Sequence, residues 1–136
     1  MISALLAAGL LVVSEPVLTP DQLAETLLAA GACGAAGWQS ANEGAGDAFV
    51  VAVAAQHPEL TPQQFREALL TAIPAAQARI FGDPIADRAS YSVWADGFGA
   101  RCDAITTAHP EILSRLPDTD ARWGEERAAF MLRLSE

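Results

Sequence analysis

The feature that most constrains the fold is a helix-start sequence that occurs twice. It reads LTPDQL at residues 18–23 and LTPQQF at residues 60–65. Thr is a preferred N-cap residue, and Pro suits the first helical position because an N–H group there would have no partner. Gln at the third helical position completes a capping box, and the flanking apolar residues form a hydrophobic staple. Both segments therefore predict the start of an α-helix.

The two starts are followed by similar sequences, TPDQLAETLLAA at residues 19–30 and TPQQFREALLTA at residues 61–72. In each, apolar residues recur at helical spacing, which predicts one buried stripe per helix. We expect the first helix to stop within Gly31–Gly37. We expect the second to end or kink at Pro74, because proline removes a helical hydrogen bond.

A His-Pro-Glu sequence follows each of two further apolar segments. Residues 49–56 (FVVAVAAQ) precede the first, and their three valines leave either a buried helix or a buried strand open. Residues 91–108 precede the second and form a long helix, in which Gly97 and Gly99 would allow a neighbour to approach closely. Because Pro disfavours helical geometry in the residue before it, each His should mark a helix end. The apolar stripe of the long helix consists of Tyr91, Trp94, Phe98, Cys102 and Ile105.

A terminal helix completes the prediction. Residues 118–120 (DTD) provide its cap, and Trp123, Phe130 and Leu134 share one side of it. We therefore predict an all-α fold, an irregular bundle of about five helices in one domain over residues 1–136. The recurring starts and ends also suggest a duplicated helical hairpin, although chance re-use of good capping chemistry explains them equally well.

The charge distribution excludes several classes of partner. The chain has 17 acidic residues against 8 arginines and no lysine, a formal net charge of -9, and its first arginine is Arg66. Nucleic-acid binding and attachment to anionic lipid both need clustered cations, so we expect neither. An acidic surface would instead speed the encounter with a basic protein. Whether the chain forms an oligomer stays open.

An apolar run near the N-terminus, within residues 1–14, allows two main interpretations. Residues 2–13 (ISALLAAGLLVV) are too few for a membrane-spanning helix, which needs about 20 residues. We expect the run to be a core element of a cytoplasmic protein. The alternative is an export signal, although the run lacks the basic residues that normally precede one.

The histidines and cysteines are the residues most suited to chemistry. His57 and His109, with Glu59 and Glu111, are candidate metal ligands if the two His-Pro-Glu sequences meet; otherwise each His caps a helix end. Cys33 and Cys102 fit no zinc or redox motif. They are candidates for a disulfide, and Cys33, in a turn of small residues, is an alternative catalytic nucleophile.

The function expected from these features is non-enzymatic. The sequence contains no cofactor motif, so we expect an accessory, assembly or inhibitor-like protein that acts by protein–protein contact. Trp38 is a candidate anchor for such contact if it is exposed, and a core residue if it folds back. The alternatives are a small-ligand or metal binder at the His-Pro-Glu helix ends, and an enzyme that uses Cys33.

Overall fold

Each Thr-Pro sequence begins a helix with the predicted capping box. In the computed structural model, which describes residues 17–134, the Thr19 hydroxyl accepts from the Gln22 backbone N–H at 3.1 Å. The Gln22 side chain in turn accepts from the Thr19 backbone N–H at 3.0 Å. The same two bonds join Thr61 and Gln64, at 3.1 and 2.9 Å. Local capping chemistry therefore starts both helices.

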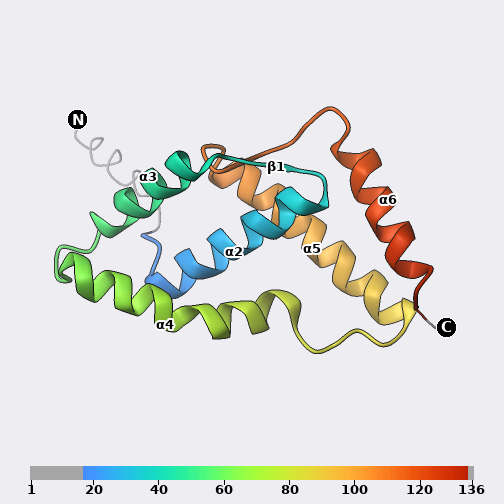
Figure 1. Ribbon diagram of the computed structural model, residues 1–136, viewed down its shortest axis with the longest axis horizontal. Coiled ribbons are helices and arrows are strands. Elements are labelled where there is room, and N and C mark those ends of the chain that lie inside the picture. The colour runs from blue at the N-terminus through green and yellow to red at the C-terminus, as the bar shows by residue number, and fades with distance from the viewer. Residues whose placement is uncertain (1–16, 135–136) are drawn as a thin grey trace, which may run out of the picture.

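The described residues form five helices and one small antiparallel sheet, which confirms the all-α prediction (Figure 1). The elements in chain order are α2 (Pro20–Ala36), β1 (Gln39–Ser40), α3 (Glu43–Ala54), α4 (Pro62–Phe81), α5 (Arg88–Ala108), β2 (Leu113–Ser114) and α6 (Thr119–Met131). The predicted core element within residues 1–14 lies outside the described residues. None of the helices within residues 17–134 has the combined length and apolarity that a membrane span requires.

Most of the ambiguous apolar segment 49–56 belongs to a helix, α3, which ends at Ala54. This helix begins earlier than the apolar run because the Asn42 side chain caps it, accepting from the Ala45 backbone N–H at 2.9 Å. Phe49 and Val53 are buried, whereas Val51 on the opposite side is 68% exposed. The segment therefore has one buried face and one exposed face in the folded protein, although its apolar composition predicts a fully buried element.

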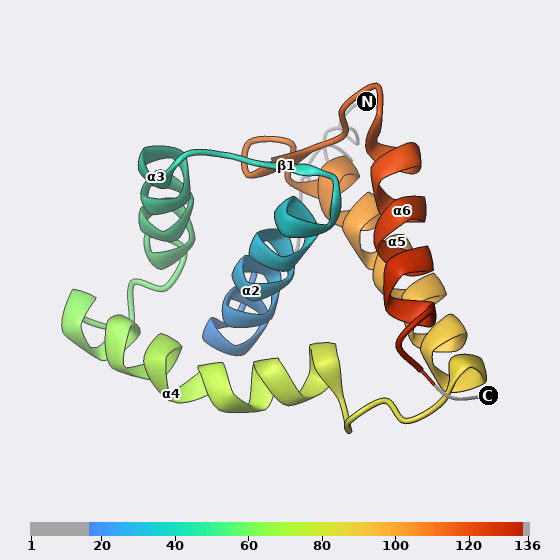
Figure 2. The same cartoon turned by 45° about the vertical axis from the view of Figure 1, so that its right-hand side comes forward.

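Of the two outcomes expected at Pro74, an end or a kink, the helix does not end there. α4 continues through Pro74 to Phe81, and Figure 2 shows that it bends near its middle. A proline removes one hydrogen bond and crowds the preceding turn, so a bend without termination is a common compromise. The helix is held on both sides of the bend, because Phe65 and Ile80 are both buried.

α2 lies at the centre of the arrangement and contacts every other element within residues 17–134 (Figures 1 and 2). Its most extensive packing is against α4, and α5 crosses it on another side. The long stripe predicted for α5 faces this centre: Tyr91, Phe98, Cys102 and Ile105 are buried, and Trp94 is half-buried. One helix thus organises the core.

Two connections that are distant in sequence are joined by the small sheet. β1 follows α2 and β2 follows α5, and they pair antiparallel with Gln39 opposite Ser114 and Ser40 opposite Leu113. The Ala41 N–H adds a bond to the Ile112 carbonyl at 3.0 Å. The sheet therefore fixes the end of α2 to the end of α5.

The start of α6 differs from the predicted cap. Asp118 occupies the N-cap position but makes no side-chain capping bond. Thr119, the next residue, is fully buried. Its hydroxyl accepts from the Leu116 N–H at 2.7 Å and donates to the Gly37 carbonyl at 3.1 Å. Tertiary contact with the end of α2 thus replaces local capping. α6 ends at Met131, so Leu134 lies beyond it.

Candidate functional site: an aromatic groove

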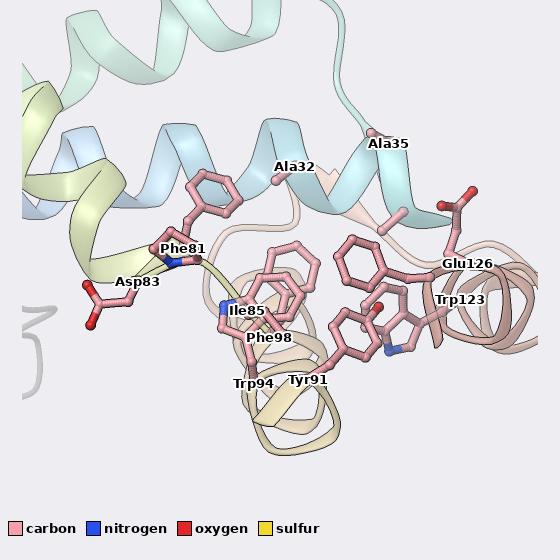
Figure 3. A pocket seen from close by; sticks show the side chains of 14 residues that line it. Ala32, Ala35, Phe81, Asp83, Ile85, Tyr91, Trp94, Phe98, Trp123 and Glu126 are labelled. Carbon is pink, nitrogen blue, oxygen red and sulfur yellow. The ribbon is translucent and has the colours of Figure 1, made fainter. Parts of the chain in front are cut away.

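One concavity of the described surface is a groove with a volume of about 520 Å³ that is lined by aromatic rings. It lies between α2, α5, α6 and the connection from α4 to α5 (Figure 3). Its lining is almost wholly apolar, and Asp83 and Glu126 are the charged residues among the lining side chains. The aromatic lining residues are Phe81, Tyr91, Trp94, Phe98, Trp123 and Phe130. The groove is thus a ring-lined surface with two carboxylates.

Helical spacing explains how two helices deliver these side chains. In α5, Tyr91, Trp94 and Phe98 follow each other at intervals of three and four residues. Trp123 and Phe130 lie seven residues apart in α6, a separation of nearly two full turns. Residues at such intervals share one helix face. Because the two faces meet, the rings gather into one cluster (Figure 3).

The rings pack on one another in a nearly continuous series. Tyr91 stacks on Phe130 with 4.5 Å between ring centroids, and Trp94 stacks on Phe98 at 4.9 Å. Phe98 contacts Trp123 at 5.5 Å, which links the α5 and α6 walls. Such pairs contribute about 0.5–1.5 kcal/mol each beyond the area they bury. The groove wall is therefore held in place before any ligand arrives.

Two further contacts fix the tryptophans. The indole N–H of Trp94 donates to the Ile80 carbonyl at 2.9 Å. A Cβ atom at Gly99 would lie 3.1 Å from Nε1 of Trp123, so glycine permits the close approach of α6. The sequence-based expectation of close approach is therefore correct at Gly99. At Gly97 it is wrong, because a Cβ atom there would meet nothing within 4 Å.

The polar groups of the groove are few. The Tyr91 side chain is almost fully buried, and this burial raises the pKa of its hydroxyl above its ordinary value of 10.0. Tyr91 therefore stays neutral near pH 7 and contributes an uncharged hydroxyl to the groove lining. Asp83 and Glu126 are exposed at the groove and supply negative charge.

Cys33 and Cys102 lie behind this surface and are joined by a disulfide, with their Cα atoms 5.8 Å apart. The bond links α2 to α5, and both side chains are fully buried. The alternative of Cys33 as a catalytic nucleophile is therefore wrong for this structure. Its sulfur is already bonded and cannot be reached from solvent.

Trp38 is not the exposed anchor that we considered from the sequence. Its side chain is 3% exposed, and its indole N–H donates to the Asp103 carboxylate at 3.1 Å. The ring lies 5.8 Å from that of Trp123 and supports the groove from behind. A tryptophan with a satisfied N–H and a buried ring belongs to the core, so the folded-back alternative is correct.

The first His-Pro-Glu sequence has a structural role. His57 Nε2 donates to the Leu18 carbonyl at 2.7 Å, and Nδ1 lies 3.2 Å from a Glu59 carboxylate oxygen. The bond to the Leu18 carbonyl, helped by Glu59, raises the pKa of His57 above its ordinary value. The imidazole thus holds the entry to α2 against the turn before α4.

The second His-Pro-Glu sequence does not complete a metal site. His109 caps the end of α5, as predicted, and its ring meets Phe49 edge-on at 5.1 Å. Glu111 is exposed. Within residues 17–134, no three or more His, Cys, Asp or Glu side chains gather as metal ligands would. The four metal candidates are therefore not brought together in this part of the chain.

Sequence reasoning missed the groove itself. The aromatic spacing in residues 91–98 and 123–130 predicts two core stripes, and this prediction is correct for Tyr91 and Phe98, which are buried. Trp94, Trp123 and Phe130 are only half-buried, however, and border the open space of the groove.

Comparison of the chain with known protein families, with curated proteins and with solved structures finds no match in any of the three.

Proposed function

We propose that this protein is a non-enzymatic binding protein whose aromatic groove holds a small ligand with an apolar body. The observation that supports the proposal is the groove itself. Its volume of about 520 Å³ lies within the range of roughly 300–1,000 Å³ for small-molecule sites. Such sites combine an apolar lining with a few polar groups that orient the ligand. Tyr91, Asp83 and Glu126 provide those groups here.

Protein–protein contact, the function first expected from the sequence, remains a prediction with weaker support. The most exposed large apolar side chains among the described residues are Val51, Val93 and Leu132, at 68, 76 and 81% exposure. They lie on α3, on α5 and at the end of α6, and isolated apolar side chains of this kind are ordinary on protein surfaces. The groove is a more specific feature than these scattered residues.

The disulfide bears on where such a protein would work. Buried disulfides persist in oxidising compartments and are rare in the cytoplasm. The Cys33–Cys102 bond thus supports an exported protein over the cytoplasmic location expected from the sequence. Export is also the alternative interpretation of residues 1–14.

The binding proposal is tested with N-phenyl-1-naphthylamine, a neutral apolar dye that fluoresces in apolar sites. We expect the purified protein to enhance its fluorescence with saturation. Ala35→Phe places a ring in the groove from α2, and it should weaken binding by about tenfold or more, equivalent to about 1.4 kcal/mol. Ala128→Phe is the matched control, because Ala128 is exposed on α6 outside the groove lining.

Two outcomes would contradict the proposal. One is the absence of saturable dye binding by the wild-type protein. The other is equal dye affinity of Ala35→Phe and Ala128→Phe, which would place the dye elsewhere. Melting curves of both variants would show that each is folded.

A further inference from the structure

The charged side chains that line the groove have the same sign. Glu126 and Asp83 stand at opposite ends of the ring cluster in Figure 3, and both line the groove. Glu126 comes three residues after Trp123 and four before Phe130 in α6. Because residues at these intervals share a helix face, the carboxylate belongs to the same face as the two rings.

Three arginines near the groove have partners other than its carboxylates. Arg127, next to Glu126, pairs with Asp96 at 2.9 Å. Arg133 lies 5.3 Å from the centroid of the Phe130 ring, and Arg88 donates to the Met131 carbonyl. None of these three arginines is among the residues that line the groove. Within residues 17–134, neither Glu126 nor Asp83 takes part in an ion pair.

We propose that the groove selects a hydrophobic cation, an apolar or aromatic body that carries an ammonium group. This inference rests on the proposed ligand-binding function and specifies the class of ligand. The faces of aromatic rings attract cations, and ammonium ligands are commonly held among such rings. The two carboxylates also attract cations, and the net charge of -9 raises the concentration of cations near the protein. An anion of the same shape would be repelled.

The test compares three naphthalene probes of different charge, of which the cation and the neutral probe have the same shape. They are trimethyl(2-naphthylmethyl)ammonium, its neutral carbon isostere 2-neopentylnaphthalene, and the anion 2-naphthylacetate. Binding is followed by tryptophan fluorescence, since Trp94 and Trp123 line the groove. We expect the cation to bind about fivefold more tightly than the isostere at low salt, and the anion to bind most weakly. The preference for the cation should shrink as salt is raised.

Charge-removing variants locate the effect. Glu126→Gln should lower affinity for the cation about threefold and leave the isostere unchanged, and adding Asp83→Asn should bring the two affinities close to equal. Glu125→Gln is the matched control, because it removes one charge from an exposed neighbour that does not line the groove. It should preserve the wild-type preference.

The possible failures are distinguishable. If the isostere binds as tightly as the cation, or if Glu125→Gln and Glu126→Gln alter the preference equally, the groove does not select a cation. The proposed binding function would survive either result. If neither the neutral probe nor the cation binds the wild-type protein, the binding function itself is wrong.

Discussion

Gly37 ends α2 with a backbone that side-chain-bearing residues rarely adopt, with φ of 134°. A Cβ atom there would also lie 3.1 Å from Cβ of Arg122 and 3.2 Å from the backbone nitrogen of Trp123. The Gly37 carbonyl accepts the buried Thr119 hydroxyl. A single glycine thus allows the end of α2 to lie against the start of α6, the helix that carries one wall of the groove.

The first prediction compares two glycines near the end of α2. Gly37→Ala should lower the free energy of unfolding by about 2 kcal/mol, because it adds both backbone strain and a steric conflict. Gly31→Ala should raise it by about 0.5–1 kcal/mol, since a Cβ atom there meets nothing within 4 Å and alanine favours a helix. Chemical denaturation followed by circular dichroism measures both. Equal effects of the two substitutions would refute this role for Gly37.

At the scale of elements, Glu25 links three helices. It lies on α2, accepts from Nε of Arg79 on α4 at 2.6 Å, and also pairs with Arg101 on α5. Its side chain is 23% exposed. The hydrogen bond from Arg79, supported by Arg101, lowers the pKa of Glu25 below its ordinary value of 4.5. The folded state therefore favours the charged carboxylate.

A pH dependence follows, whose direction can be worked out. Because the pKa of Glu25 is lower in the folded state, its contribution to stability is fully present above about pH 4.5 and disappears as the pH falls through the folded-state pKa. Glu25→Gln should lower the free energy of unfolding by about 1 kcal/mol at pH 7. The gap between the variant and the wild type should then narrow as the pH falls below about 4.5.

Glu125→Gln is the control for this measurement. Glu125 is exposed on α6, and its substitution removes one negative charge, as Glu25→Gln does. Its stability should stay parallel to that of the wild type over the same pH range. A gap between Glu25→Gln and the wild type that does not change with pH would show that the ion pairs with Arg79 and Arg101 do not favour the charged form.

For the whole molecule, the longest-range covalent constraint is the disulfide. It joins residues 69 positions apart and links α2, the central helix, to α5. A cross-link over such a long loop removes many conformations from the unfolded chain, which stabilises the folded state. The bonded side chains are fully buried beside Trp38, so the bond also belongs to the core behind the groove.

The prediction for the disulfide is a large loss of stability on reduction. Replacing both cysteines with alanine should lower the free energy of unfolding by about 4 kcal/mol. A reductant should destabilise the wild type by a similar amount and leave the variant unchanged. Melting curves with and without reductant measure this. A wild-type melting temperature that does not respond to full reduction would refute the stabilising role of the bond.

The sequence predicts those features of the site that depend on residues close together in the chain, and not those that depend on contacts between distant segments. The helical spacing of Tyr91, Trp94 and Phe98 was evident from the sequence, because it depends on one helix alone. Their contact with Phe130 depends on how α6 packs against α5, and no local sequence pattern predicts that packing. Trp38 looked like a loop residue for the same reason, since its partner Asp103 is 65 residues away.

The sequence by itself determined where α2 and α4 begin, because caps and apolar spacing act within a few residues. Thr19 and Thr61 start helices through bonds to residues three positions ahead. Only the tertiary structure decided which faces meet, and it alone carried α4 through Pro74, paired Cys33 with Cys102 and left a groove among the rings. Those outcomes depend on packing between distant segments, where burial and steric fit outweigh local preference.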